Sequence, residues 1–273
     1  MSNRRTTPPP APEPLPAPVV DAHTHLDACG VTGRDDLAAA MDRAAAVGVT
    51  RVVTVADDLD SARWAAEAAT WHDGVVAAVA LHPTRTSEFG ADVQAALEEL
   101  AARPRVRAIG ETGLDHYWDH SPHDAQERAF RWHIDLAKRI GKPLMIHDRD
   151  AHDDVLRVLD SEGAPETVVF HCFSGDADMA RRCADAGYVL SFAGPLTFRN
   201  GGGLREAAAV VPLGQLLVET DAPFLTPDPY RGRPNEPYLV PHTARRLAEV
   251  KGVDVATLCD AVSATAERVF GPW

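Results

Sequence analysis

The sequence predicts a single (β/α)8 barrel, a ring of eight parallel strands with an α-helix after each strand. Three observations indicate this fold. The chain has 273 residues, a length typical of one such barrel. Apolar residues make up 45% of it, which is enough for a substantial core. Short apolar runs also alternate with helical segments, as parallel strands and right-handed crossovers require.

The first 18 residues differ from the rest. The segment 1–18 is crowded with proline, and no apolar stretch follows its paired arginines, as an export signal would require. We interpret it as a disordered, partly extended tail, and we expect the barrel to span residues 19–273. No apolar run approaches the length that crosses a bilayer, so we expect no membrane association.

Eight runs of β-branched or apolar residues are the expected strands. They fit a closed barrel better than an open sheet, although their number alone does not settle closure. In chain order they are residues 18–22, 51–55, 75–80, 106–110, 143–147, 167–171, 188–191 and 215–219.

Segments rich in Ala, Leu, Arg and Glu are the expected helices, at residues 37–47, 61–71, 93–102, 126–140, 179–186, 241–251 and 255–270. Gly48, Gly141 and Gly187 each follow such a segment and precede a strand, as helix-stopping glycines do. Segments 196–203 and 223–237 are too polar or too rich in proline for regular structure. We expect them to form long loops after strands seven and eight.

Charge and cysteine content limit the function classes. The net charge is −13 and the basic residues are nearly all arginine, with no lysine-rich run, so extensive non-specific binding to duplex nucleic acid is disfavoured. A nucleic-acid substrate stays possible if metal ions and a few arginines neutralise phosphate locally. The four cysteines have no CxxC spacing, which favours a reduced, cytoplasmic protein.

Histidines and carboxylates gather where the expected strands end. In a barrel these ends open onto one face, where loops build the active site. The residues are His23 and His25 after strand one, His82 after strand three, Glu111 after strand four, His147 after strand five, His171 after strand six and Asp221 after strand eight.

The spacing and number of these residues favour two divalent ions. His23 and His25 lie two apart on an extended segment, so both imidazoles point the same way and suit Zn²⁺, Mn²⁺ or Fe²⁺. With Glu111, His147, His171 and Asp221 they make six candidate ligands, which is more than one tetrahedral ion requires, and Glu111 is the natural bridging carboxylate. Lys142 lies at the opposite end of its strand, which argues against a bridge made by a carboxylated lysine. An HxH pair or a lone histidine is weak evidence by itself, but chance placement of six ligands on one face is improbable.

The chain resembles the TatD-type metal-dependent deoxyribonucleases of the amidohydrolase superfamily. The resemblance covers residues 19–270 and rests on motifs in order: DAHTHLD, LHP, GETGLDHYWDHSPHDAQERAF, KPLMIHDRDA, HCFSG, SFAGPLTFRN, LLVETDAPFLTP and YRGRPNEP. It implies a (β/α)8 barrel whose metal ligands are His23, His25, Glu111, His147, His171 and Asp221. Ala80 departs from the family, which commonly has glycine there.

Other motif residues have expected roles in the site. Asp221 and Glu111 are the candidate catalytic residues, because Asp221 can also accept a proton from the attacking water. Glu219 faces the same side as Asp221 and is expected to orient a metal ligand. The candidate substrate-binding residues are His82, Asp115, Arg149, Arg199 and Arg231, although Asp115 could instead orient a ligand, and Arg199, Arg231 and Arg233 could be solvated loop arginines.

The expected reaction is hydrolysis of a phosphodiester by metal-activated water, with two ions of Zn²⁺, Mn²⁺ or Mg²⁺. A narrow barrel mouth favours single-stranded DNA, and the family resemblance implies 3′-to-5′ exonuclease activity. We expect the protein to be a monomer. Tyr117, Trp118 or Phe198 could stack on a base, although core packing is favoured for each. The alternatives are hydrolysis of another ester such as aminoacyl-tRNA, a small-molecule amidohydrolase, and a metal-binding module without activity.

Overall fold

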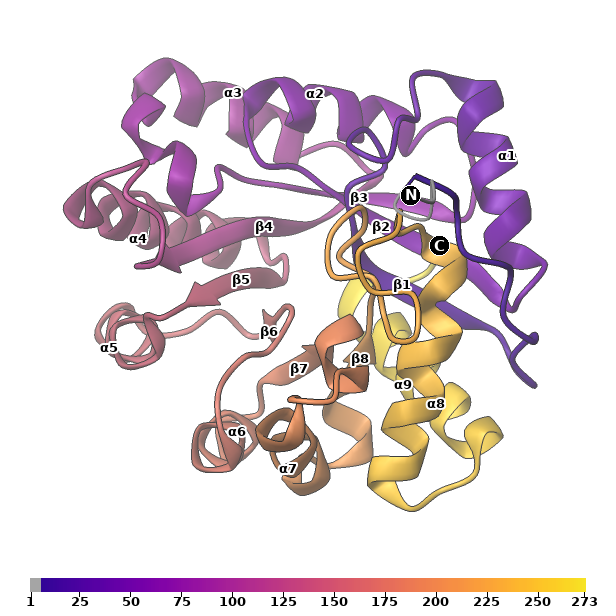
Figure 1. Ribbon diagram of the computed structural model, residues 1–273. Helices are drawn as coiled ribbons and strands as arrows, with labels where there is room; N and C mark the ends of the chain where they lie inside the picture. Colours follow the sequence, from indigo (N-terminus) through magenta and orange to yellow (C-terminus); the bar gives the residue numbers. More distant parts are fainter. Residues whose placement is uncertain (1–5) are drawn as a thin grey trace.

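The computed structural model describes residues 6–273 and contains eight parallel strands in a nearly closed barrel. Neighbouring strands pair in chain order from first to last. Figure 1 shows them at the centre of the molecule, with the helices arranged around them. The strands are β1 Val19–Thr24, β2 Val49–Val55, β3 Val75–Val79, β4 Val106–Asp115, β5 Leu144–Arg149, β6 Val168–Phe170, β7 Val189–Phe192 and β8 Leu216–Val218. This arrangement confirms the predicted fold class.

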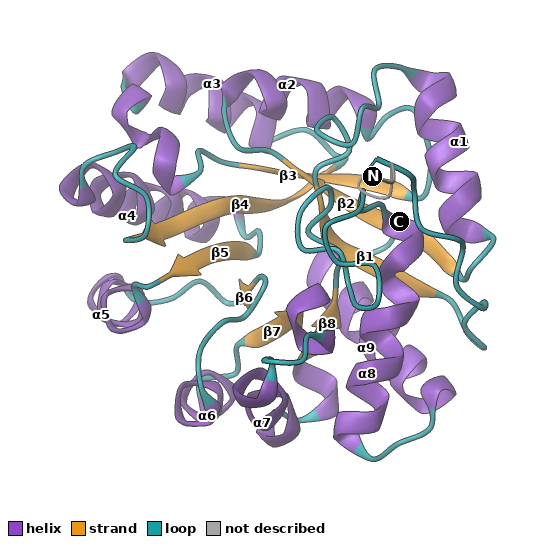
Figure 2. Ribbon diagram, viewed as in Figure 1, coloured by secondary structure: helices purple, strands orange, loops and turns teal. Residues whose placement is uncertain are grey.

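The helices form the outer layer, drawn in purple in Figure 2. They are α1 Arg34–Ala45, α2 Leu59–Ala68, α3 Ala91–Ala101, α4 His123–Ile140, α5 His152–Glu162, α6 Ala177–Asp185, α7 Gly202–Val210, α8 Val240–Lys251 and α9 Val255–Phe270. Short 3-10 turns occupy Pro83–Glu88, Gly194–Thr197, Leu213–Gln215 and Pro237–Leu239. Gly48, Gly141 and Gly187 all have positive φ after a helix, as predicted.

Two apolar layers hold the barrel together. Alternate strand residues such as Val53 and Val55 point into the barrel, where small side chains fill the limited space. Phe270, at the end of α9, joins this interior cluster. The other strand face packs against the helices in a larger cluster. The interior is therefore filled by side chains, and chemistry is confined to its ends.

The seam between the first and last strands has few backbone contacts. A single β-bridge joins Thr24 to Ala222. Nearby, the Asp221 amide donates to the His23 carbonyl at 2.9 Å and the His25 amide donates to the Ala222 carbonyl at 2.8 Å. The carboxylate of the buried Asp21 also accepts from the Thr220 amide at 2.9 Å. The barrel thus closes mainly at the end that carries the predicted site.

Residues 6–18 lie against the barrel, in place of the disorder expected for the tail. Leu15 is buried, and its amide donates to the Val47 carbonyl at 3.0 Å. The Tyr238 hydroxyl donates to the Pro9 carbonyl at 2.7 Å, and the Arg233 guanidinium donates to the Thr7 carbonyl at 2.9 Å. Burial of one leucine side chain stabilises a fold by about 2 kcal/mol, which offsets part of the cost of ordering the chain. Residues 1–5 lie outside the described residues.

Most element bounds differ from the predicted ones by one or more residues, and helix α5 was not among the predicted segments. Strands β1, β4 and β5 continue furthest past their predicted ends, so His23 and Glu111 lie within strands and His147 lies inside β5 instead of at its end. Their polar side chains interrupted the apolar pattern that marked the strands. Helix α7 begins at Gly202, inside the predicted loop 196–203. Glycine is tolerated there because the amides of a first helical turn have no intrahelical partner.

Candidate metal centre

Six predicted ligands converge at the carboxyl end of the barrel. Strands β1, β4 and β5 carry His23, Glu111 and His147. His25 and His171 directly follow β1 and β6, and Asp221 lies three residues past the end of β8. Ring nitrogens and carboxylate oxygens of this set lie within 4.8 Å of one another in overlapping groups. The full set is His23, His25, Glu111, His147, His171 and Asp221.

Glu111 lies at the centre of the cluster, with one oxygen facing each of two histidine pairs. Its Oε2 atom is 3.3 Å from Nε2 of His23 and 3.6 Å from Nε2 of His25. Its Oε1 atom is 2.6 Å from Nδ1 of His147 and 2.7 Å from Nε2 of His171. A carboxylate placed in this way can serve two ions at once.

Asp221 completes the first of the two groups. Its Oδ1 atom is 3.5 Å from Nε2 of His25 and 3.8 Å from Nε2 of His23. The two imidazoles are 3.3 Å apart at Nε2, so three donor atoms point at one small volume. Three such donors with Glu111 Oε2 match the usual coordination number of zinc.

The glycine of the GETG motif allows β4 to approach β5 beside these ligands. Gly113 has φ +138°, and a Cβ atom built there would lie 2.1 Å from the carbonyl oxygen of His147. No other residue fits this position without moving the backbone of a candidate ligand. The glycine therefore contributes to the placement of His147 relative to Glu111.

The composition of the buried cluster fits metal ions. The buried acidic side chains of the cluster and its surroundings are Glu111, Asp115, Glu219 and Asp221, whereas no lysine or arginine is buried within residues 6–273. Buried carboxylates require a cationic partner, because an isolated charge is strongly disfavoured away from water. Divalent cations bound by imidazole and carboxylate would provide that partner.

The pKa values of the cluster residues also favour charged carboxylates next to cations. Burial opposes charge on Glu111, but the charges of His171 and His82 outweigh it and hold the pKa of this carboxyl well below its usual range. Burial would lower the pKa of His25, yet its hydrogen bond with Asp221 and the charge of Asp57 raise it to about 10. The carboxylates are thus ready-made anionic ligands.

Two further carboxylates contact candidate ligands. The Oδ2 atom of Asp115 lies 3.0 Å from Nε2 of His147. The Oε1 atom of Glu219 lies 3.4 Å from Nδ1 of His171 and accepts from the Cys172 amide at 2.7 Å. Glu219 is therefore placed as expected. For Asp115, expected among the substrate contacts, the geometry favours the alternative of orienting a ligand.

The structure adds two residues to the neighbourhood of the cluster. His82, expected to bind substrate, has Nε2 only 3.4 Å from Oε1 of Glu111 and 3.4 Å from Nδ1 of His147. Asp57 follows β2, and its Oδ1 atom is 3.4 Å from Nδ1 of His25. The sequence interpretation missed Asp57, although a carboxylate two residues after the second strand was the available signal.

A cavity of about 760 Å³ opens over the cluster, within the size range of small-ligand sites. Arg149 lines it, as predicted, and its guanidinium lies 4.0 Å from the centre of the Tyr117 ring. Arg199 and Arg231 are exposed and are not among the lining residues. Arg231 instead stacks on the buried Phe198, 4.2 Å from its ring centre, so Phe198 is unavailable to a base.

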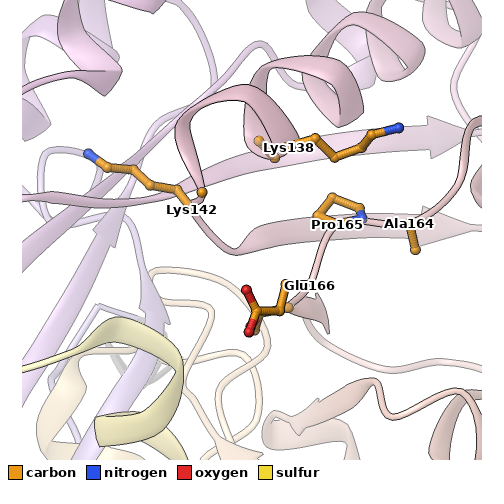
Figure 3. Close-up of a pocket in the computed structure, with 8 residues that line it drawn as sticks. Lys138, Lys142, Ala164, Pro165 and Glu166 are labelled. Atoms are coloured by element: carbon orange, nitrogen blue, oxygen red, sulfur yellow. The ribbon is translucent and has the colours of Figure 1, made fainter.

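A smaller cavity of about 160 Å³ lies at the opposite end of the barrel, next to the start of β5 (Figure 3). Lys138 and Lys142 point away from each other in this view. Their amino groups are held by backbone carbonyls, that of Lys138 at 2.7 Å from the Glu162 oxygen and that of Lys142 at 2.5 Å from the Val106 oxygen. Lys142 is thus remote from the metal ligands, as the sequence indicated.

Two global features complete the description. All four cysteines are free thiols. Among residues 6–273, no helix combines the length and the apolar character that crossing a membrane demands.

Comparison with known proteins gives consistent results. Residues 20–271 match the family model described as TatD related DNase. The "Uncharacterized metal-dependent hydrolase TatD" of Mycobacterium tuberculosis is 56% identical over 93% of this chain and 98% of its own length. The "3'-5' ssDNA/RNA exonuclease TatD" of Citrobacter rodentium is 36% identical over 84% of this chain and 89% of its own length. The crystal structure of YJJV, a TatD homolog from Escherichia coli K12, is similar with a TM-score of 0.86 and 27% identity, covering 92% of this chain and 97% of that one.

Proposed function

This chain belongs to the TatD-related DNase family of metal-dependent hydrolases, and we propose that it is a 3′-to-5′ exonuclease that acts on single-stranded DNA. The observation that carries the proposal is the placement of Glu111, whose two oxygens face separate histidine pairs beneath a cavity rimmed by Arg149. Paired metal ions and an arginine suit a phosphodiester better than a neutral substrate. Relatives named as 3′-5′ ssDNA/RNA exonucleases support the same substrate class.

We assign two divalent ions to the cluster. His23, His25 and Asp221 would hold one, and His147 and His171 the other, with Glu111 shared between them. Divalent ions with such ligands supply Lewis acidity, lowering the pKa of water to about 7 and offsetting charge on phosphate oxygens. Imidazole and carboxylate donors suit Zn²⁺ or Mn²⁺. Mg²⁺ is a further candidate, but it prefers carboxylate and water oxygens to imidazole nitrogens.

The protein's own groups position the substrate and move the proton. Asp221 lies at the floor of the cavity, where its carboxylate can accept a proton from the attacking water. Arg149 at the rim can grip a phosphate oxygen, because a guanidinium forms paired hydrogen bonds to phosphate. The cavity accommodates a strand end but not a duplex, which favours single-stranded substrates. The free cysteines support a place in the reducing cytoplasm, and we propose a monomer.

The test is cleavage of an end-labelled single-stranded DNA oligonucleotide by the purified protein, supplied with Mg²⁺ or Mn²⁺. Asp221→Ala, purified identically, controls for contaminating nuclease. We expect a ladder that shortens from the 3′ end with the wild type and is absent with the variant. Equal cleavage by both proteins, or none by either, contradicts the nuclease assignment.

The same preparation separates the alternatives. Release of an amino acid from aminoacyl-tRNA without DNA cleavage would identify a hydrolase of a carboxylic ester. Turnover of a small amide would identify an amidohydrolase. Metal retained without hydrolysis of any substrate would leave only a metal-binding module.

A further inference from the structure

The exposed aromatic side chains of this protein gather at one place. Within residues 6–273, the exposed large hydrophobic side chains are Tyr117 at 53%, Trp118 at 44% and Phe224 at 54%. Trp118 and Phe224 both line the cavity above the metal centre, and the Tyr117 ring packs edge-on against Trp118 with centres 4.8 Å apart. Exposed apolar area confined to the mouth of one cavity indicates a ligand that covers it.

The two lining aromatics lie on opposite sides of the metal centre. Trp118 follows β4 and Phe224 follows β8, and these strands are four positions apart in a ring of eight. The Phe224 ring contacts His25, with ring centres 6.0 Å apart. A strand end that reaches Glu111 and Asp221 therefore passes between the two rings.

The backbone holds both aromatics in place. The amides of Tyr117 and Trp118 each donate to Oδ1 of Asp115 at 3.0 Å, the carboxylate that also orients His147. The Phe224 amide donates to the Asp221 carbonyl at 2.9 Å, and the Asn235 side chain donates to the Phe224 carbonyl at 2.5 Å. The ring positions are thus linked directly to the metal ligands.

Polar groups beside Trp118 match the rest of a nucleotide. The Arg149 guanidinium lies 4.0 Å from the centre of the Tyr117 ring and 5.8 Å from that of Trp118. His120 stacks on Trp118 at 5.3 Å with the two planes 14° apart. Flat faces next to a cation suit a base and its phosphate, whereas an aliphatic ligand would leave the cation unmatched.

We propose that Trp118 and Phe224 are specificity-determining stacking platforms for the two bases that flank the phosphodiester cleaved in the metal centre. This inference rests on the proposed nuclease function and adds how the substrate is selected. Paired, stacked bases of a duplex do not present their faces, so the platforms select unpaired ends. Every base has a π face, so selection is independent of sequence.

The test compares two fluorescein-labelled oligothymidylates, one intact and one with abasic residues at its last two 3′ positions. Wild type, Trp118→Ala, Phe224→Ala and Trp118→Phe are each measured with both. With the intact strand, we expect each alanine variant to raise KM about 10-fold or more with little change in kcat, and Trp118→Phe to stay close to the wild type. With the abasic strand, the wild type should show a similar loss, and the alanine variants should lose little more.

Controls make each outcome decisive. Arg63→Ala, on the outer surface of α2 and paired with Asp60 at 3.1 Å, should match the wild type throughout. Unchanged KM in both alanine variants, or equal wild-type KM for the two strands, overturns the platforms while the nuclease assignment stands. If the wild type cleaves neither strand, the nuclease assignment fails. Fluorescence anisotropy then decides: weaker binding of the abasic strand by the wild type but not by Trp118→Ala supports the platforms, and equal affinities overturn them.

Discussion

Asp115 and His147 are joined by a contact of 3.0 Å between Oδ2 and Nε2, on the side of the imidazole ring opposite Glu111. A carboxylate next to Nε2 favours the tautomer that carries the proton on Nε2. Nδ1, which lies 2.6 Å from Oε1 of Glu111, is then the unprotonated nitrogen that can bind a metal ion. The ligand atom of His147 is thus selected by a residue that is not itself a candidate ligand.

Replacement of that carboxylate should weaken metal binding. We expect Asp115→Asn to lower the affinity for Zn²⁺ or Mn²⁺ by about 10- to 100-fold, because His147 loses its fixed orientation. Competition with a chromophoric chelator measures this. Asp119→Asn, an exposed carboxylate four residues along, should bind metal as the wild type does. An unchanged affinity in Asp115→Asn would show that His147 is oriented in another way.

The shared position of Glu111 predicts a change in metal stoichiometry. We expect the reconstituted wild type to bind two equivalents and Glu111→Gln at most one, because a neutral amide cannot bridge two cations. Elemental analysis after gel filtration measures the content, and circular dichroism verifies that the variant is folded. Glu98→Gln, at the outer surface on α3, is the matched control. Two equivalents in Glu111→Gln would rule out its bridging role.

The arginines should separate into one that binds substrate and others that do not. We expect Arg149→Met to raise KM for an oligonucleotide about 10-fold and to reduce the salt dependence of binding by about one ion, because a phosphate contact is lost. Methionine preserves much of the apolar stem beside Tyr117. Arg231→Met should leave KM unchanged, since Arg231 stacks on Phe198 outside the cavity. A raised KM in Arg231→Met and an unchanged KM in Arg149→Met would place the phosphate site in the loops that follow β7 and β8.

A buried histidine outside the site should make stability depend on pH. Burial lowers the pKa of His133 to about 4, although its hydrogen bond to the Ala129 carbonyl acts in the opposite direction. The unfolded chain therefore takes up this proton near pH 6.5, before the folded chain does. The free energy of unfolding should fall as the pH drops from about 6.5 to 4, by up to about 3 kcal/mol from this residue.

Urea titrations of the wild type and His133→Gln at pH 7 and pH 4.5 measure this contribution. Glutamine can still donate to Ala129 and accept from the Leu81 amide, which lies 3.3 Å from the present ring nitrogen. We expect the variant to lose less stability on acidification than the wild type. An identical loss in both proteins would place the acid sensitivity elsewhere.

The barrel and the convergence of the candidate ligands could be predicted because their signals are repetitive and positional. Alternating apolar runs marked the strands, and polar residues at the ends of those runs marked the ligands. Strand ends were less accurate for the same reason: Glu111 and Asp115 lie inside β4, where function replaced apolar residues with buried polar ones. Local pattern cannot distinguish such a residue from the start of a loop.

Tertiary contacts account for the remaining differences. The tail resembled a disordered segment by composition, but its order depends on Arg233, Tyr238 and Arg245, which lie more than two hundred residues along the chain and donate to its carbonyls. Likewise, nothing local showed that Phe224 is exposed while Phe198 is covered by Arg231. These facts arise only when distant segments meet.

A metal ion at the first proposed site would span the weakly paired seam of the barrel. His23 and His25 belong to one side of the join and Asp221 to the other, where a single β-bridge links Thr24 to Ala222. An ion bound by all three residues would link the first and last strands and so stabilise the closed barrel. We expect chelation to speed amide hydrogen exchange of His25 and Asp221 far more than that of central residues of β2 and β3. Uniform exchange across the ring would contradict this. If the ion links the two strands in this way, the stability of the barrel depends on the concentration of free metal ions as well as on its apolar core.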